Sequence, residues 1–340
     1  MFKLYNYLPV SFQNFLITLK NIQVYNYKYG AIPFFKNLKE IQKAVISENY
    51  LINEQENVEK INKLLYDATN NTKFYKVRSN YYQKLDEIND LNQIPILEKE
   101  IIKKNNDEFI SSNVSIFNAI KFKTSGTTGT PMYGFIRKKD LRKRFKIILK
   151  TMCLSGFDIQ KKYARFVGKN IAPNGAVYRK DYINNHYFFS INRLSNRTVF
   201  DYYNAIVNNK IIYLEGYPST INNLVNLFKN NNLEIKHVKG IYLTAEKLND
   251  YQKENISSYF KCSVFDYYGS TEQSVYIYKP SSQETYECSN VTGYLEVVNN
   301  NGYLCKEGEE GEMIITSFTS YFTPLIRYRI GDRCVVSKIN

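Results

Sequence analysis

The sequence predicts an α/β fold, with mostly parallel sheets covered by helices and a small β-rich subdomain near the end of the chain. Segments typical of strands and helices alternate between residues 210 and 272, which is the pattern of βαβ units. After residue 285, short strand-like segments are separated by glycine turns, as in an antiparallel sheet. With 340 residues, of which 44% are hydrophobic, the chain can bury a substantial core in one large domain or two smaller ones.

The first part of the chain is predicted to be helical. Its opening, "MFKLYNYLPVSFQNFLITLKNI", is an amphipathic segment and not a signal peptide, because polar residues interrupt its apolar run and no small-residue cleavage site follows. Residues 36–70 carry apolar side chains at mostly helical spacing, which predicts one or two amphipathic helices. Pro95 marks a turn into a further charged helix. No stretch offers the roughly 20 consecutive apolar residues that a membrane span needs.

The pattern changes at residue 119, where the α/β region is expected to begin. "AIKFKTS" predicts a short strand that enters a glycine-rich loop, and we expect a helix rich in Lys and Arg to follow that loop directly. Strands are then predicted at "KIIYLEGYPS", "HVKGIYLTAE" and "CSVFDYYGSTE", and helices at "TINNLVNLFKNNN" and "NDYQKENISSYF". The segments "VTGYLEVVNNNGYLC" and "EGEEGEMIITSFT" predict the antiparallel sheet or small barrel-like subdomain.

Charge and cysteine content exclude several classes of protein. A net charge of +14 would suit a nucleic acid, but no zinc-finger, RRM-like or helix-turn-helix signature is present, so we expect no nucleic-acid partner. The basic stretch 137–150 is either a solvated helix face or a phosphate-attracting rim beside the preceding loop. Five scattered cysteines without a C-x-x-C pair, and only two histidines, predict reduced thiols, a cytoplasmic location and no structural zinc.

The most informative single motif is "TSGTTGTP", residues 124–131. It is not a Walker A loop, because G-x-x-x-x-G-K-[ST] occurs nowhere in the chain. Consecutive Gly, Ser and Thr residues can nevertheless present backbone N–H groups and hydroxyls to phosphate oxygens. Ordinary surface turns use the same residue types, so the loop alone does not decide between a turn and a phosphate site.

Three further segments place polar residues after predicted strands. "YLTAEKL" (242–248) contains Glu246, "DYYGSTE" (266–272) ends with Glu272, and "TPLIRYRIGD" (323–332) ends with Asp332. In an open α/β sheet, ligands bind beyond the carboxyl ends of the strands. The order and spacing of these segments therefore favour a ligand site over a set of unrelated turns.

Together these motifs resemble the adenylate-forming superfamily of acyl- and aryl-CoA synthetases, and within it the phenylacetate-CoA ligase-like branch that includes the CapK capsular polysaccharide biosynthesis proteins. The matching segments are "LPVSFQNF", "TSGTTGTP", "GYPS" (216–219), "TAE" (244–246), "YGSTE" (268–272) and "PLIRYRIGD" (324–332). The resemblance implies the large N-terminal domain of these enzymes. It would comprise a helical region packing on the core (1–118), an α/β nucleotide-binding core (119–284) and a β-rich subdomain (285–340).

The resemblance implies an ATP-dependent reaction in two steps. A carboxylate attacks the α-phosphate of ATP to give an acyl-adenylate and pyrophosphate, and a nucleophile, usually the thiol of coenzyme A, then takes the acyl group. No covalent enzyme intermediate is needed, so catalysis would rest on positioning and charge stabilisation. The implied cofactors are ATP or AMP and Mg²⁺, with coenzyme A as a co-substrate. The implied process is capsular or surface polysaccharide biosynthesis.

The resemblance also assigns roles to individual residues. Thr271 would contact the α-phosphate, and Glu272 would ligate Mg²⁺, a hard cation that suits a carboxylate. Tyr268 would stack on adenine, and Asp332 would accept hydrogen bonds from the ribose. The other implied nucleotide-binding residues are Thr124, Ser125, Gly126, Thr127, Thr128 and Gly129 around the outer phosphates, Thr244, Ala245 and Glu246 along the nucleotide pocket, and Gly269.

Each assignment has a structural alternative. Glu246 and Glu272 could be helix-start carboxylates that the helix dipole favours. Tyr268 is one of 31 tyrosines and could pack in the core. Asp332 could be a turn residue. The acyl pocket is expected between the region 160–220 and the segment after Glu272, where the aromatic side chains are equally suited to a core.

The chain departs from the family pattern in two places. Thr130 stands where the family often has a lysine, which weakens charge compensation at pyrophosphate. Family members continue past the "GD" motif into a mobile domain of roughly a hundred residues that carries an adenylation lysine, whereas this sequence ends at Asn340. We therefore expect the lid to be absent or supplied by a separate polypeptide. A truncated or degenerate nucleotide-binding module with little catalysis is the alternative function. The identity of the carboxylate, the final acceptor (coenzyme A or a sugar) and the oligomeric state are not predicted.

Overall fold

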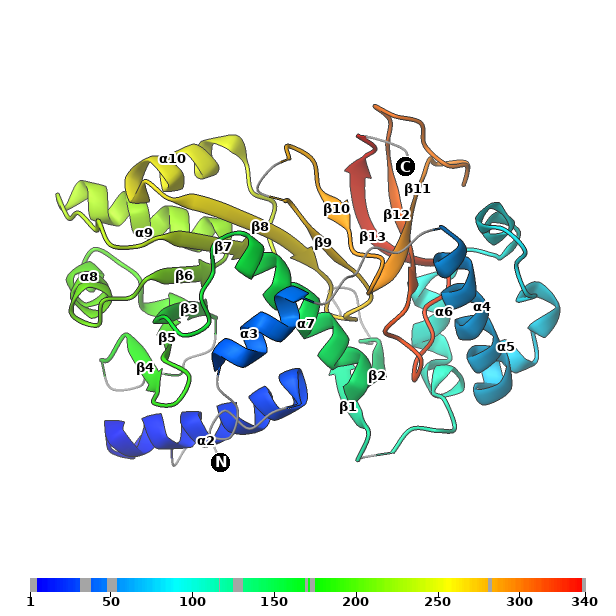
Figure 1. Ribbon diagram of the computed structural model, residues 1–340, viewed down its shortest axis with the longest axis horizontal. Helices are drawn as coiled ribbons and strands as arrows, with labels where there is room; N and C mark the ends of the chain where they lie inside the picture. The colour runs from blue at the N-terminus through cyan, green and yellow to red at the C-terminus, as the bar shows by residue number, and fades with distance from the viewer. Residues whose placement is uncertain are drawn as a thin grey trace. The chain divides into compact units, whose positions relative to one another are not determined.

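The computed structural model describes residues 5–30, 38–47, 54–115, 117–124, 131–168, 171, 175–280 and 283–337. These residues form two compact units, each assembled from separate parts of the chain (Figure 1). Unit 1 comprises Met1–Glu48, Ile148–Tyr268 and Lys279–Glu284, and unit 2 comprises Asn49–Ile147, Gly269–Tyr278 and Thr285–Asn340. The sequence suggested a division into three consecutive regions, 1–118, 119–284 and 285–340, and that division stays a prediction.

Unit 1 is built on a mostly parallel sheet with the strand order β8-β7-β6-β3-β5-β4. Its strands are β3 (Tyr163–Val167), β4 (Tyr178–Asp181), β5 (His186–Ser190), β6 (Tyr213–Gly216), β7 (Gly240–Thr244) and β8 (Ser263–Gly269). Only β4 runs antiparallel to its partner, β5, within this set of described strands. The predicted α/β fold with a mostly parallel sheet is therefore confirmed.

The core of unit 1 lies on the face of the sheet that is covered by α8 (Val199–Asn208), α9 (Pro218–Asn230) and α10 (Asp250–Phe260) (Figure 1). Strand residues such as Phe166, Leu214 and Ile241 pack there against fully buried helix residues such as Leu224. The opposite face carries an aromatic cluster, in which the Phe157 ring lies 4.9 to 5.5 Å from the rings of Tyr163, Tyr213 and Tyr242.

Helix α2 (Val10–Tyr29) packs on β4 with its polar side chains inward. Gln13, Asn14 and Thr18 are buried, and Asn14 Oδ1 accepts a hydrogen bond from the Lys180 backbone N–H at 3.0 Å. The apolar side chains Phe12, Phe15 and Leu19 are instead 44 to 48% exposed. Hydrogen bonds rather than apolar burial therefore attach much of this helix. None of the helices in the described ranges is both long and apolar enough to cross a membrane.

Unit 2 combines helices with small antiparallel sheets. Its described helices include α4 (Glu54–Asn71), α5 (Lys73–Lys76), α6 (Lys99–Lys104) and the start of α7 (Lys138–Leu154), while α3 (Leu38–Ser47) belongs to unit 1. Strands β11 (Gly293–Val298), β12 (Glu310–Ser317) and β13 (Tyr328–Val335) form a three-stranded antiparallel sheet, and β9 (Tyr276–Tyr278) pairs antiparallel with β10 (Glu287–Cys288). The predicted β-rich region is thus an antiparallel sheet and not a barrel in the residues described.

The expectation that the basic helix follows the glycine-rich loop directly is wrong. Strand β1 (Ala119–Lys123) enters the loop, but β2 (Tyr133–Arg137) leaves it and pairs antiparallel with β1. The buried residues of β2 alternate with half-buried ones, which is the period of a strand. With only five residues, the second of which is Gly134, β2 gives a weak strand signal in the sequence, and α7 begins immediately after it.

A buried ion pair fixes the segment that enters β13. The Arg327 and Glu296 side chains are each 4% exposed, and Arg327 Nη2 lies 2.8 Å from Glu296 Oε1. Arg327 Nη1 also donates to the backbone carbonyls of Asn92 and Ile94. Arg327 adopts a φ of +46°, a left-handed conformation that is uncommon outside glycine and is held here by these contacts. Burial raises the pKa of Glu296, although Arg327 opposes that rise.

Replacing Arg327 by Ala should destabilise the protein strongly, by about 3 to 5 kcal/mol, because Glu296 would stay buried without its cation. The exposed pair of Arg333 and Glu310 provides a matched control, and Arg333→Ala should cost less than about 1 kcal/mol. Urea denaturation followed by circular dichroism measures both changes. Equal losses of stability in the two variants would contradict the proposed role of the buried pair.

Candidate functional site

In unit 1, the parallel sheet brings three of the predicted segments to one edge. Gly216 of "GYPS" aligns with Leu243 in β7, and Thr244 of "TAE" aligns with Tyr267 in β8. Tyr268 comes directly after Tyr267 and is half-buried. The carboxyl ends of β6, β7 and β8 are therefore neighbours, as expected of a ligand-binding edge in an α/β sheet.

Glu246 links two of these segments. Its Oε2 accepts a hydrogen bond of 3.0 Å from the Ser219 backbone N–H in the first turn of α9, where the helix dipole favours a carboxylate. Glu246 therefore contacts the start of a helix, but this helix is α9, which precedes Glu246 in the sequence. The preceding Ala245 has a φ of +68°. Strained backbone of this kind is concentrated at functional sites, because the surrounding structure must hold it in place.

A buried carboxylate lies on the aromatic face of the same sheet. Glu215, in the segment "LEGYPS", has a side chain that is 5% exposed, and its Oε1 lies 2.8 Å from Arg165 Nη2. The Tyr267 hydroxyl donates to the same oxygen at 2.9 Å. Burial raises the pKa of Glu215 to about 7, while the Tyr267 hydrogen bond and the Lys28 charge act in the opposite direction. The region expected to line an acyl pocket therefore contains a titratable polar cluster as well as aromatic residues.

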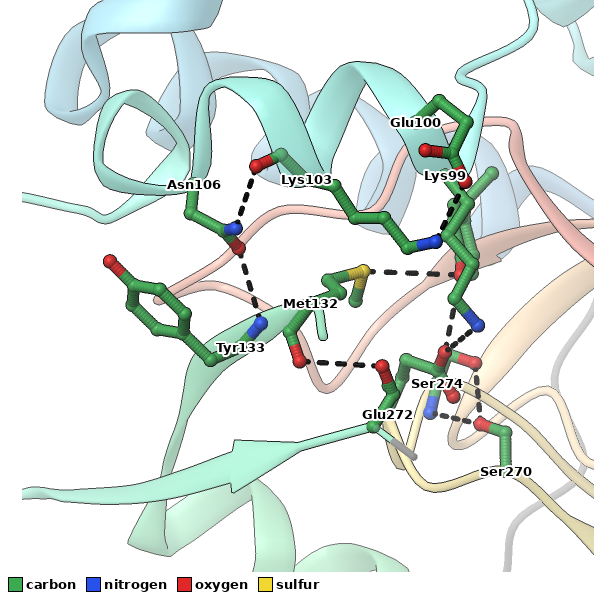
Figure 2. A network of polar contacts seen from close by, with 11 residues as sticks. Lys99, Glu100, Lys103, Asn106, Met132, Tyr133, Ser270, Glu272 and Ser274 are labelled. Carbon is green, nitrogen blue, oxygen red and sulfur yellow. Dashed lines mark hydrogen bonds and ion pairs between the residues drawn. The ribbon is translucent and has the colours of Figure 1, made fainter. Parts of the chain in front are cut away.

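In unit 2, Glu272 is the centre of a polar network (Figure 2). The residue is 3% exposed, and its Oε1 accepts a hydrogen bond of 3.1 Å from the Tyr328 hydroxyl. Lys99 Nζ lies 3.3 Å from the same oxygen. The network joins a helix, a loop and a strand that are far apart in the sequence. Among the described residues, Glu272 is therefore held by tertiary contacts and does not act as a helix cap.

The same network reaches the residues that flank the glycine-rich loop (Figure 2). The Tyr328 hydroxyl lies 4.0 Å from the sulfur of Met132, and the Met132 carbonyl accepts a hydrogen bond of 2.9 Å from the Thr124 N–H. Thr124 itself is buried. The structure thus places the two ends of the loop near Glu272. The predicted phosphate-binding residues Ser125, Gly126, Thr127, Thr128 and Gly129, together with Thr130, lie outside the described residues.

The segment between Gly269 and Glu272 is tightly placed. A Cβ atom at Gly269 would lie 2.5 Å from Arg144 Nη2, so the buried Arg144 guanidinium would have to shift to make room for it. Thr271 is exposed, in keeping with a residue that is open to a ligand. Gln273 has a φ of +57°, and its carbonyl accepts a hydrogen bond from the Thr319 hydroxyl at 2.9 Å. A non-glycine residue with positive φ thus lies within "TAE" and another lies directly after "YGSTE".

Asp332 lies in a bulge of β13. The register between β12 and β13 shifts there, since Glu312 aligns with Arg333 but Ile314 aligns with Arg329. Gly331 has a φ of +96°, which a glycine adopts without steric cost. Asp332 is exposed. A bulge redirects side chains out of the regular ladder, and bulges are common beside active sites, so the conformation suits a residue that receives a ligand.

Two contributors to this network were not identified from the sequence. Lys99 lies 173 positions before Glu272, and Tyr328 lies 56 positions after it, so no local pattern connects them. Tyr328 does fall within the motif "PLIRYRIGD", whose ordered match to the family was the available signal. For Lys99, the sequence contains no such signal, because "ILEKEII" indicates only the start of a charged helix.

The residues around Glu272 fit a magnesium ion that is shared with phosphate. Glu272 is a buried carboxylate, and Mg²⁺ commonly takes one or two carboxylates together with phosphate oxygens and water, so Glu272 would suit such an ion. No group of three or more His, Cys, Asp or Glu side chains comes together as a metal site within the described ranges.

Comparison with known proteins finds relatives by sequence and similar folds among solved structures. No protein-family model matches the chain. The chain is 26% identical to protein CapK of Staphylococcus aureus, and the match covers 97% of this chain and 72% of CapK. It is 31% identical to indoleacetate–lysine synthetase of Pseudomonas savastanoi over 40% of this chain and 32% of that protein.

Among solved structures, the fold is similar to that of 2-hydroxyisobutyryl-CoA ligase in an open conformation with 2-HIB-AMP and CoA. The TM-score is 0.68 at 15% identity, and the match covers 84% of this chain and 65% of the ligase. The same ligase in the thioesterification state gives a TM-score of 0.67. The chain spans slightly less than two thirds of the length of these ligase structures, and the shared part has the fold that the sequence predicted.

Replacing Gly269 by Ala should destabilise unit 2 by about 1 to 3 kcal/mol, since the new Cβ would displace the buried Arg144. Gly168→Ala is the matched control, because the nearest atom to its Cβ would be Ile191 Cδ1 at an ordinary 3.6 Å. Thermal unfolding compares the two. A loss of stability at position 168 as large as that at 269 would show that the close approach is not the cause.

Replacing Glu215 by Gln should change how stability depends on pH. The folded-state pKa of about 7 lies above the ordinary value of 4.5, so the native state favours the protonated carboxyl. Wild-type protein should therefore lose up to about 3 kcal/mol of stability from this group as pH rises from about 4.5 to about 7. The Gln variant should lack that loss, whereas the exposed control Glu307→Gln should retain it. Urea denaturation near both pH limits tests this, and parallel curves for wild type and Glu215→Gln would refute it.

Proposed function

We propose that this chain, a CapK homologue that belongs to the adenylate-forming superfamily, binds ATP and activates a carboxylate as an acyl-adenylate. The carboxylate oxygen would form a bond to the α-phosphorus, and the bond from that phosphorus to the bridging oxygen would break, releasing pyrophosphate. The observation that carries this proposal is the network that links Glu272 to both ends of the glycine-rich loop through Tyr328 and Met132. A buried carboxylate beside a loop of this composition suits a phosphate-bound cation.

The roles proposed for unit 2 rest on its contacts. Glu272 would hold Mg²⁺, with Tyr328 and Lys99 fixing the direction of its carboxylate. Thr271, which is exposed, would contact the α-phosphate. Asp332 would accept hydrogen bonds from the ribose hydroxyls, and its bulge presents the side chain to solvent. When bound, Mg²⁺ would offset the charge of the phosphate oxygens, while the protein would supply orientation.

In unit 1, we propose that Tyr268 stacks on the adenine ring and that Thr244, Ala245 and Glu246 line the nucleotide pocket. Glu246 already accepts the Ser219 N–H through Oε2, so its main part would be to fix the end of β7 relative to α9. Positive φ at Ala245 supports a functional constraint there, because an ordinary turn would use glycine or asparagine.

The acyl acceptor is proposed from the names of the relatives. The names of the relatives point to carboxylate activation, since one joins indoleacetate to lysine and the ligase structure holds 2-HIB-AMP and CoA. We propose that the chain serves a similar activation, with coenzyme A or an amine or hydroxyl as acceptor. A role in capsular polysaccharide biosynthesis is proposed from the similarity to CapK.

Exchange of labelled pyrophosphate into ATP, with a panel of carboxylates, tests this function. Glu272→Gln should lower the exchange rate by about a hundredfold or more, because a neutral amide binds Mg²⁺ poorly. Glu307→Gln, an exposed change of the same chemistry in unit 2, should leave the exchange rate unchanged. Folding of each variant is checked by circular dichroism.

ATP binding without any exchange, for every carboxylate tested, would favour the alternative of a nucleotide-binding module with little catalysis. Failure of ATP to bind at all would remove the proposed function. Equal exchange rates in wild type and Glu272→Gln would exclude the proposed role of this carboxylate even if the activity is present.

A further inference from the structure

An open pocket of about 540 Å³ lies in unit 2 at the base of the β1–β2 hairpin. The hairpin register pairs Lys123 with Tyr133 next to the glycine-rich loop, and Ala119 with Arg137 at the other end. Arg137 and Asn118 line the pocket, so it lies at the end of the hairpin opposite that loop. The volume falls within the roughly 300–1,000 Å³ that is typical of small-molecule sites.

The lining of this basal pocket is strongly basic. Arg137, Lys138, Lys139 and Arg142 face a single lining carboxylate, Asp67. These cations come from the end of β2 and the first turns of α7, which places them on one side of the pocket. The electrostatic potential of such a lining attracts anions, and Arg and Lys together suit phosphate oxygens.

Two of these side chains, Arg137 and Lys138, are already held in position. Arg137 is ion-paired with the buried Asp140, and its guanidinium carbon lies 3.9 Å from the centroid of the Tyr321 ring. Lys138 Nζ donates to the Phe117 carbonyl at 2.8 Å. Ordered cations lose less conformational entropy when a ligand binds than mobile surface lysines do. The basic stretch that the sequence left open between a solvated face and a phosphate-attracting rim thus contributes to a concave surface, away from the loop.

The pocket also offers an aromatic ring and amide groups. Phe117 lines it and is 83% exposed, which is unusual for a phenylalanine and leaves a ring face for stacking. Asn71, Asn113 and Asn118 line the same pocket. The side-chain amides of Asn71 and Asn118 donate to the carbonyls of Asp67 and Asn113, and each NH₂ group has a second hydrogen to donate. Cations for phosphate, a ring for a planar base and amides for hydroxyls form the combination that recognises a nucleotide.

We propose that the basal pocket binds a phosphorylated nucleoside. This ligand is separate from the ATP of the proposed adenylation, and the inference does not require that the chain forms adenylates. The same chemistry occurs in coenzyme A and in nucleotide-activated sugars, both of which carry a phosphorylated nucleoside. Binding of either would bring the remainder of such a molecule, a thiol arm or a sugar, to unit 2.

Isothermal titration of the full chain with adenosine 3′,5′-bisphosphate, uridine 5′-diphosphate and inorganic phosphate tests the proposal. Lys139→Gln/Arg142→Gln should weaken nucleotide binding by about tenfold or more, because two charge-assisted contacts would be lost. Phe117→Ala should weaken binding of the nucleotide but not of inorganic phosphate. Lys239→Gln, an exposed lysine in unit 1, is the control and should leave binding unchanged.

Tighter binding of the adenosine probe, and then of coenzyme A, would support the coenzyme as the source, and tighter binding of the uridine probe would support a nucleotide-activated sugar. Absence of binding by both nucleotides, or equal affinity in wild type and the double variant, would overturn the proposal. Inorganic phosphate binding as tightly as the nucleotides would overturn its nucleoside part. Thermal unfolding shows whether each variant is folded. If the double variant does not fold, nucleotide binding by Lys139→Gln alone, a change at an exposed position, tests the proposal instead.

Discussion

The burial of the Glu272 carboxylate is the constraint on which the described site of unit 2 depends. A carboxylate that is 3% exposed must be compensated by a cation or by hydrogen bonds, and here Lys99 and Tyr328 provide both. Those partners come from α6 and β13, so satisfying one charged group requires two distant elements to lie beside it. The Tyr328 hydroxyl also contacts Met132, which places the end of the glycine-rich loop in the same network. Charge compensation thereby organises the segments that the proposed chemistry needs.

In unit 1, the parallel sheet brings the motif segments together. One face carries the apolar core under α8, α9 and α10, and the other carries tyrosines, phenylalanine and the Arg165–Glu215 pair. Because the strands run in parallel, their carboxyl ends meet, and the segments containing Gly216, Thr244 and Tyr268 become neighbours without any contact between their side chains being required. A buried, titratable Glu215 on the aromatic face means that this part of the unit is not uniformly apolar. A carboxylate substrate bound nearby would meet polar as well as aromatic groups.

The sequence pattern predicted the helices and strands that depend mainly on neighbouring residues. Strands β7 and β8, helices α9 and α10 and the antiparallel β11–β13 sheet are explained by periodicity and turn residues, and the motif residues by their ordered resemblance to a family. Features that depend on distant pairing could not be predicted. Lys99 reaches Glu272 across 173 positions, Ser219 reaches Glu246 across 27, and the basal pocket joins residues from α4 to the segment before β13. Strand β2 was not predicted for another reason, since it has only five residues and one of them is a glycine, which leaves too weak a pattern.

Helix α2 is attached to its unit by its polar side, and this reverses the usual rule for stabilising a helix. Gln13, Asn14 and Thr18 satisfy backbone and side-chain groups around β4, including the Lys180 and Tyr182 N–H groups. Leucine is the usual choice when a core is redesigned. At these buried positions it would leave the donors without hydrogen-bond partners, where water reaches poorly. Hydrophobic repacking is therefore the wrong strategy for strengthening this end of the molecule. Engineers who wish to stabilise it should preserve the amides and alter the outward-facing phenylalanines instead.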